Sequence, residues 1–63
     1  MRIAGLVRQG VTEGRWRPGE PVPSITTLSQ EYGVARQTAA KALRLLESEG
    51  LLARVPGLGY YVA

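Results

Sequence analysis

The chain has 63 residues, enough for one small domain, and its eight Lys and Arg residues against five acidic residues give a net charge of +3. Cys and His are both absent, which excludes disulfide bonds and removes the usual zinc ligands and the commonest catalytic nucleophiles and bases. The sequence also lacks a phosphate-binding loop, a signal peptide and an apolar run of about 20 residues. We therefore expect no enzymatic activity, no cofactor or metal, no membrane contact and a cytoplasmic location.

The first predicted helix covers residues 2–13. Apolar residues recur there at the spacing of one helix face, and these are Ile3, Leu6, Val7 and Val11. Gly14 then stands where a helix commonly ends in a left-handed residue. We expect an amphipathic helix that packs its apolar stripe on the rest of the domain.

The next segment, residues 15–23, contains three of the four prolines and cannot continue the helix. Pro18 and Gly19 together signal a turn. Val22 lies between two prolines, which favours a short extended strand. Trp16 carries a large apolar side chain, and we expect it to pack over the core.

Two helices joined by a tight turn follow, the pattern of a helix-turn-helix. Ser24 is placed as the N-cap of a helix over residues 25–32, and Gly33 supplies a left-handed turn that only glycine adopts without strain. The second helix covers residues 36–49, and in DNA-binding proteins of this pattern it enters the major groove. Its inner arc is Ala39, Ala42, Leu43 and Leu46, and its outer arc is Arg36, Gln37, Ala40, Lys41, Arg44, Glu47 and Ser48.

Residues 51–55 and 60–62 are rich in β-forming residues. They flank a loop, residues 56–59, that contains a proline and two glycines, which predicts a β-hairpin. The predicted fold class is therefore mainly α with a small β-hairpin, a winged helix-turn-helix. Its expected order is a helix, a short strand, two helices and a two-stranded wing.

The outer arc of residues 36–49 carries the side chains that would read and hold DNA in such a fold. Arg36 has the geometry for a bidentate contact with guanine, and Gln37 for one with adenine. Thr38, Lys41 and Arg44 are candidates for phosphate contacts. Each has a plain alternative, because Thr38 can bond its own backbone and the others can be solvated surface residues.

Further candidate contacts lie outside that helix. Ser24 and Thr26 stand at the start of a helix, where backbone N–H groups favour an anion such as phosphate. Gly57 and Gly59 allow the hairpin loop to approach the minor groove closely, although turn geometry alone also accounts for both glycines. With the positive net charge, these residues favour double-stranded DNA as the partner and a nucleoid-associated location.

Nearly the whole chain resembles the N-terminal winged-helix domain of the GntR (gluconate-repressor) family of bacterial transcription regulators. The matches, in chain order, are Pro18-Gly19 and Pro23-Ser24 with the family's PG…LPS signature, Ala35 to Thr38 with its S-R-x-T helix start, and Gly57-x-Gly59 with Tyr61-Val62 in its wing. The resemblance implies that residues 1–63 are the DNA-binding domain of a transcription regulator, with repression as the expected role.

Three positions at which the family carries a DNA-contacting side chain differ here. Thr26 stands where the family usually has Arg, Ala40 where it often has a second Arg, and the wing tip has Pro56 and Leu58 in place of a basic or polar residue. Ala35 replaces the usual helix cap, at a cost of about 1 kcal/mol. Either the operator differs, or the remaining cations carry more of the binding, or DNA binding is weakened.

The resemblance further implies a homodimer on a two-fold operator in the full-length regulator, an effector domain absent from this chain, and a monomer for this fragment. A complete small protein of phage or plasmid origin is an alternative to an excised domain. A different functional class is also open, in which the winged helix is a protein-interaction or oligomerisation module with weakened or no DNA binding.

Overall fold

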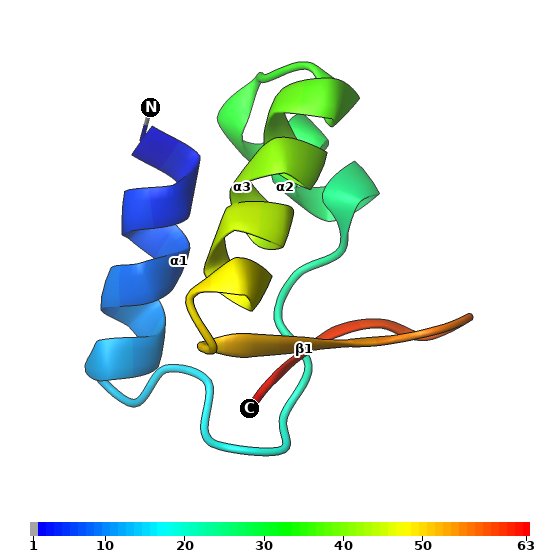
Figure 1. The fold of residues 1–63 in the computed structure, drawn as a ribbon. Helices are drawn as coiled ribbons and strands as arrows, with labels where there is room; N and C mark the ends of the chain where they lie inside the picture. The colour runs from blue at the N-terminus through cyan, green and yellow to red at the C-terminus, as the bar shows by residue number, and fades with distance from the viewer. Residues whose placement is uncertain (1) are drawn as a thin grey trace.

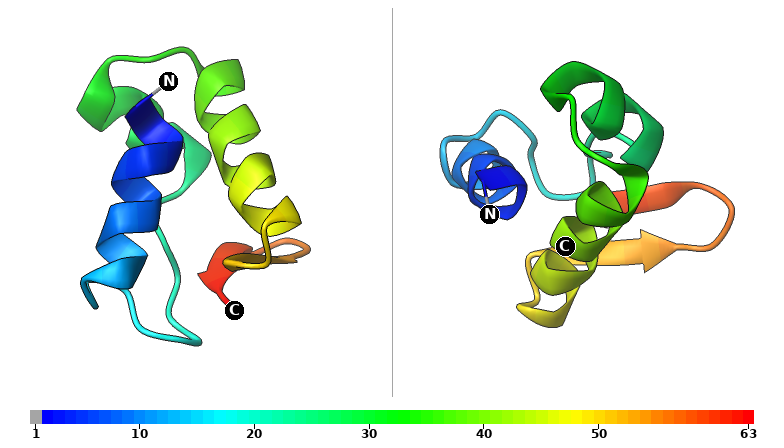
Figure 2. Two further views of the ribbon diagram at one scale, coloured as in Figure 1. Left: turned by 60° about the vertical axis from the view of Figure 1, so that its left-hand side comes forward. Right: turned by 90° about the horizontal axis from the view of Figure 1, so that it is seen from above.

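The computed structural model describes residues 2–63, which form three helices and one β-hairpin (Figure 1). The elements are α1 (Arg2–Thr12), α2 (Ile25–Tyr32), α3 (Arg36–Ser48), β1 (Leu52–Val55) and β2 (Gly59–Val62). α1 and α2 both pack against α3, and the hairpin lies across the C-terminal end of α3 (Figures 1 and 2). The predicted winged helix-turn-helix is confirmed. None of the described helices is long and apolar enough to span a membrane.

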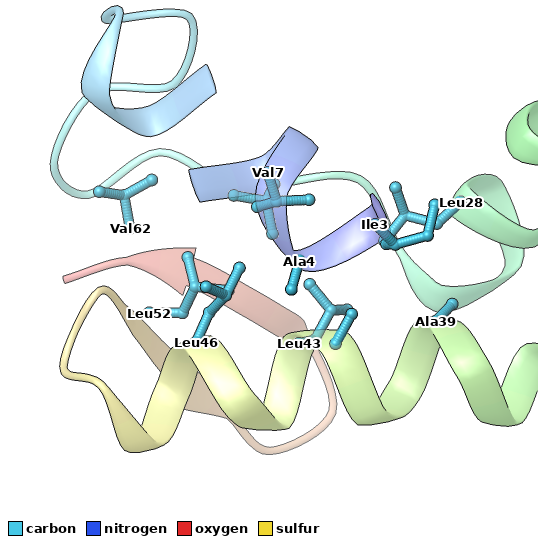
Figure 3. Close-up of a cluster of buried hydrophobic side chains, with 11 residues drawn as sticks. Ile3, Ala4, Val7, Leu28, Ala39, Leu43, Leu46, Leu52 and Val62 are labelled. Atoms are coloured by element: carbon cyan, nitrogen blue, oxygen red, sulfur yellow. The ribbon is translucent and has the colours of Figure 1, made fainter. Parts of the chain in front are cut away.

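One apolar core joins all of these elements (Figure 3). Small side chains on α3 let the other helices approach closely, because Ala39 is fully buried and Ala42 nearly so. The buried apolar residues are Ile3, Ala4, Val7, Val22, Leu28, Ala39, Ala42, Leu43, Leu46, Leu52 and Val62. The inner arc predicted for α3 is therefore the buried one. Leu6, which was expected in the apolar stripe of α1, is exposed instead.

The two strands pair antiparallel, with Leu52 opposite Val62 and Val55 opposite Gly59. The separate strand predicted around Val22 is wrong. This segment makes an isolated bridge between Pro21 and Tyr61, with hydrogen bonds from the Val22 N–H to the Tyr60 carbonyl at 3.1 Å and from the Val62 N–H to the Glu20 carbonyl at 2.9 Å. The prolines on either side of Val22 have no N–H to donate, so a regular ladder cannot continue along the segment.

Two contacts hold α1 and the loop after it in place. The Arg8 guanidinium forms a bidentate ion pair with Glu49, at 2.9 and 2.8 Å from Nη2 to the two carboxylate oxygens, which joins α1 to the end of α3. Trp16 packs against the core, as predicted, and its ring lies on buried Gly10 of α1. A Cβ atom at position 10 would overlap ring atom Cζ3 and lie 2.8 Å from Cε3. Close packing therefore favours glycine at this position.

Alanine substitutions at the two glycines inside α1 should change the free energy of unfolding in opposite directions. Gly10→Ala should lower the free energy of unfolding by about 1–3 kcal/mol, because the Trp16 ring must move off the helix. Gly5→Ala is the matched control, since a Cβ there meets nothing within 4 Å. It should raise the free energy of unfolding by up to about 1 kcal/mol through helix propensity. Urea titrations followed by circular dichroism measure both, and equal stabilisation by the two variants would contradict the packing of Trp16.

Candidate nucleic-acid interface

The turn between α2 and α3 is fixed by backbone and side-chain bonds. Gly33 adopts the left-handed conformation at φ 65°, as predicted, so the chain reverses with no strain. The Ser29 hydroxyl donates to the Val34 carbonyl at 2.6 Å, and Val34 packs against the core. The two helices therefore keep a set relative orientation, which is what a helix-turn-helix needs in order to present α3.

The two helix starts are capped differently. Ser24 is the predicted N-cap of α2, since its Oγ accepts from the Thr27 N–H at 3.1 Å. The same hydroxyl donates to Thr27 Oγ1 at 3.0 Å, so its proton is already used within the domain. Ala35 has the extended backbone of an N-cap, at φ −65° and ψ 150°, but has no side-chain cap bond. The start of α3 thus keeps N–H groups without a side-chain partner.

Most of the predicted contact residues of α3 lie on its free face. Arg36, Gln37, Lys41 and Arg44 are exposed, while Thr38 and Ala40 are half-buried. The face divides into two flanks. On the α2 side, a shallow hollow is lined by Ile25, Thr26, Arg36, Gln37, Ala40 and Arg44. On the α1 side, a second hollow is lined by Ala4, Thr38, Lys41, Ala42 and Leu45.

A direct contact joins two candidate residues on the α2 flank. Arg36 Nη2 donates to Thr26 Oγ1 at 2.6 Å. These residues are ten positions apart, in the first turns of α3 and α2, and the interhelical turn brings them together. The sequence pattern placed both at the interface without indicating that they touch.

The wing contributes one cation that the sequence analysis missed. Arg54 of β1 lines a third hollow, between α3 and the hairpin, with Ile25, Ala40, Arg44, Glu47 and Tyr60. Alternate residues of a strand share a face, so Arg54 lies on the same side of β1 as buried Leu52, which packs beside α3. The position of Arg54 follows from the phase of β1, which is set once Leu52 is known to be buried.

The tip of the wing projects away from the helices (Figure 2). Gly57 and Gly59 both have positive φ, at 81° and 109°, so turn geometry alone requires these two glycines. Leu58 between them is 70% exposed, and no charged residue occupies positions 56–59. Residues 2–63 also hold no group of three or more acidic, His or Cys side chains able to bind a metal.

Comparisons with known proteins agree with this geometry. The family model of bacterial regulatory proteins of the gntR family matches residues 1–62. The chain is 40% identical over 62 residues to the histidine utilization repressor of Pseudomonas putida, covering 98% of this chain and 25% of that protein. It is 36% identical over 62 residues to the transcriptional repressor NagR of Bacillus subtilis, covering 98% of this chain and 26% of that protein. The chain thus spans about a quarter of the length of these relatives.

A solved structure with the same fold contains DNA. The AraR DNA-binding domain in complex with operator ORR3 superposes with a TM-score of 0.95 at 34% identity, covering 98% of this chain and 75% of that one. The match extends over all three helices and the hairpin, because nearly the entire chain is covered.

The missing side-chain cap at the start of α3 predicts that a capping residue at position 35 would stabilise the domain. Ala35→Ser should raise the free energy of unfolding by about 1 kcal/mol, because the backbone at position 35 already has N-cap geometry and the new hydroxyl can accept from the first turn of α3. Ser24→Ala is the converse control and should lower it by about 1 kcal/mol through loss of the α2 cap. Thermal unfolding of both variants checks the pair, and no gain from Ala35→Ser would show that the start of α3 is already satisfied.

Proposed function

Because the chain belongs to the gntR family of bacterial regulatory proteins and is a DNA-binding domain of that family, we propose that it recognises one double-stranded DNA sequence by placing α3 in the major groove. The observation that carries this is the free face of α3, where Arg36, Gln37 and Arg44 stand exposed together while the opposite face is held by the core. A helix held in this way offers side chains of fixed position to base edges.

The proposed contacts are of two kinds: contacts with base edges, which read the sequence, and contacts with phosphates, which position the domain. Arg36 and Gln37, at the N-terminal end of α3, have the donor geometry for guanine and adenine respectively. Lys41 and Arg44 stand on different flanks of α3, which suits contacts with phosphates on the two sides of the groove. Arg54 extends the cationic surface from Arg44 onto the wing.

Secondary contacts follow from the starts of the helices and from the wing. Ser24 and Thr26 lie at the start of α2, whose first N–H groups favour a phosphate. Thr38 borders the core and faces the α1 flank, where its hydroxyl can reach the backbone of DNA. Ala40 leaves space between Arg36 and Arg44, and Gly57 and Gly59 bring the wing backbone to the minor groove.

The role in the whole regulator is a further part of the proposal. Relatives that are transcriptional repressors support repression, and they are about four times as long as the region they share with this chain. We assign the response to an effector, and the homodimer that matches a two-fold operator, to such additional sequence. Alone, the domain binds as a monomer and more weakly, because it lacks the contribution of a second half-site.

The hollow on the α1 flank favours a second candidate function, a protein-interaction module. Leu45, which is 47% exposed, lines this hollow with Ala4 and Ala42. Apolar side chains of this kind suit a protein partner better than a phosphate backbone. Such a partner would leave the α2 flank, with its arginines, unused.

Replacing one arginine tests the site. Arg36→Ala should lower affinity for the selected DNA sequence by roughly 5- to 100-fold, the range for losing one bidentate base contact. Arg17→Ala is matched in charge, and the loop after α1 that contains Arg17 lies at the end of the domain away from the start of α3 (Figure 1). It should keep affinity near the wild-type value. Fluorescence anisotropy measures both, and equal losses would mean that only net charge matters.

Salt dependence separates the two candidate functions. DNA binding by the wild-type chain should weaken steeply between about 50 and 200 mM salt, as counterions return to the phosphates. Lys41→Ala and Arg44→Ala should each make the log–log slope shallower by about 0.9, one phosphate contact apiece. Binding titrations at several salt concentrations give these slopes. An unchanged slope in either variant would show that the replaced residue makes no contact with a phosphate.

A further inference from the structure

We infer that Thr26 orients Arg36 for base recognition, so that a neutral hydroxyl on α2 sets the sequence preference of α3. This inference rests on the proposed function, because it concerns how the same face reads DNA. Its starting point is the 2.6 Å bond from Arg36 Nη2 to Thr26 Oγ1, between two exposed side chains. Thr26 is thus a positioning residue that acts through Arg36.

Both ends of this bond are anchored. Thr26 lies in the first turn of α2, which Ser24 caps and whose Leu28 is buried in the core at 1% exposure. Arg36 begins α3, and the turn between the helices is held by the bond from Ser29 to Val34. A long arginine side chain is therefore fixed at its backbone and at its guanidinium. It keeps far fewer rotamers than a solvated arginine does.

The position of the bond on the guanidinium decides which donors remain for DNA. An arginine has five N–H donors in one plane, and Thr26 engages one that belongs to Nη2. The remaining donors keep the parallel geometry that guanine O6 and N7 accept, and the plane of the fork is set before DNA arrives. Pre-orientation favours the one base that fits the fixed fork, because a freely rotating arginine would adapt to several acceptors.

The residues around the pair make the effect specific to Thr26. The hollow on the α2 flank is lined by Ile25, Ala40 and Gln37 beside the pair, and none of these has a hydrogen bond to Arg36 among the bonds of the described residues. Ala40 adds no polar group that could take the place of the Thr26 hydroxyl. Removing that hydroxyl therefore breaks the one hydrogen bond that the Arg36 guanidinium makes within the described residues.

A pair of variants at position 26 tests the inference. A duplex is first selected from a randomised pool with the wild-type 63-residue chain, and a mixed-sequence duplex serves as the non-specific probe. Thr26→Val keeps the shape and β-branching but removes the acceptor, and it should lower the ratio of selected to mixed-sequence affinity roughly tenfold. Thr26→Ser keeps the acceptor and should hold this ratio within about twofold of wild type. The ratio is the readout because loss of a phosphate contact by the Thr26 hydroxyl would lower both affinities alike and leave the ratio unchanged.

A double-mutant cycle with Arg36 identifies the route of the effect. In the Arg36→Ala background, Thr26→Val should change the affinity ratio by less than about twofold, because the partner of the hydroxyl is gone. A full tenfold effect in that background would overturn the inference, since Thr26 would then contact DNA by itself. Circular dichroism melts of all variants control for folding, which an exposed position should not disturb.

The outcomes for the inference and for the proposed function are distinct. If the wild-type chain enriches no sequence from the pool, the proposed function fails and the inference falls with it. If a sequence is enriched but Thr26→Val and Thr26→Ser give the same affinity ratio, the proposed function stands and the inference is overturned. A lower affinity ratio in Thr26→Val, with the ratio of Thr26→Ser unchanged, supports both the inference and the proposed function.

Discussion

The burial of one face of α3 is the constraint on which the rest of this domain depends. α3 contacts α1, α2 and β1, and its inner side chains Ala39, Leu43 and Leu46 are fully buried. A chain of 63 residues has one small core, and four of the eleven buried apolar residues in the described part of the chain lie on α3, so a tilt or rotation of α3 would open that core. The packing therefore fixes, at the same time, which face of α3 is free. The same packing of α3 therefore stabilises the core and orients the free face of the helix.

In the proposed function, the free face of α3 both attracts DNA through its charges and reads the base sequence. Cations stand on both flanks of α3 and on the wing, at Lys41, Arg44 and Arg54, where they suit the even negative charge of a duplex backbone. Near the N-terminal end of α3, Thr26 faces Arg36 as an uncharged acceptor. If Thr26 orients Arg36 as we infer, this uncharged partner raises selectivity for one base without adding charge to the surface.

Local signals in the sequence predicted the helices and the hairpin well. They did not predict contacts between residues that are far apart in the chain. The cap at Ser24 and the turn at Gly33 depend only on neighbouring residues, and the structure has both. The expected strand at Val22 failed because the prolines on either side of it have no N–H to donate to a ladder, a local signal that the sequence carries. Arg54 and the bond of Arg36 to Thr26 were missed for a different reason. Strand phase and helix-to-helix placement follow from tertiary packing, which periodicity does not encode.

The contact of Gly10 with Trp16 has a consequence for how sequences of this kind diverge. The ring occupies the space that a side chain at position 10 would need, so the two positions share one volume. A change at one of them therefore alters the cost of a change at the other. A larger residue at position 10 is better tolerated beside a smaller one at position 16, and Trp16 favours glycine on that turn of α1. In an alignment of related domains, this coupling should appear as paired variation between two sites six residues apart, independent of any change in the DNA they bind.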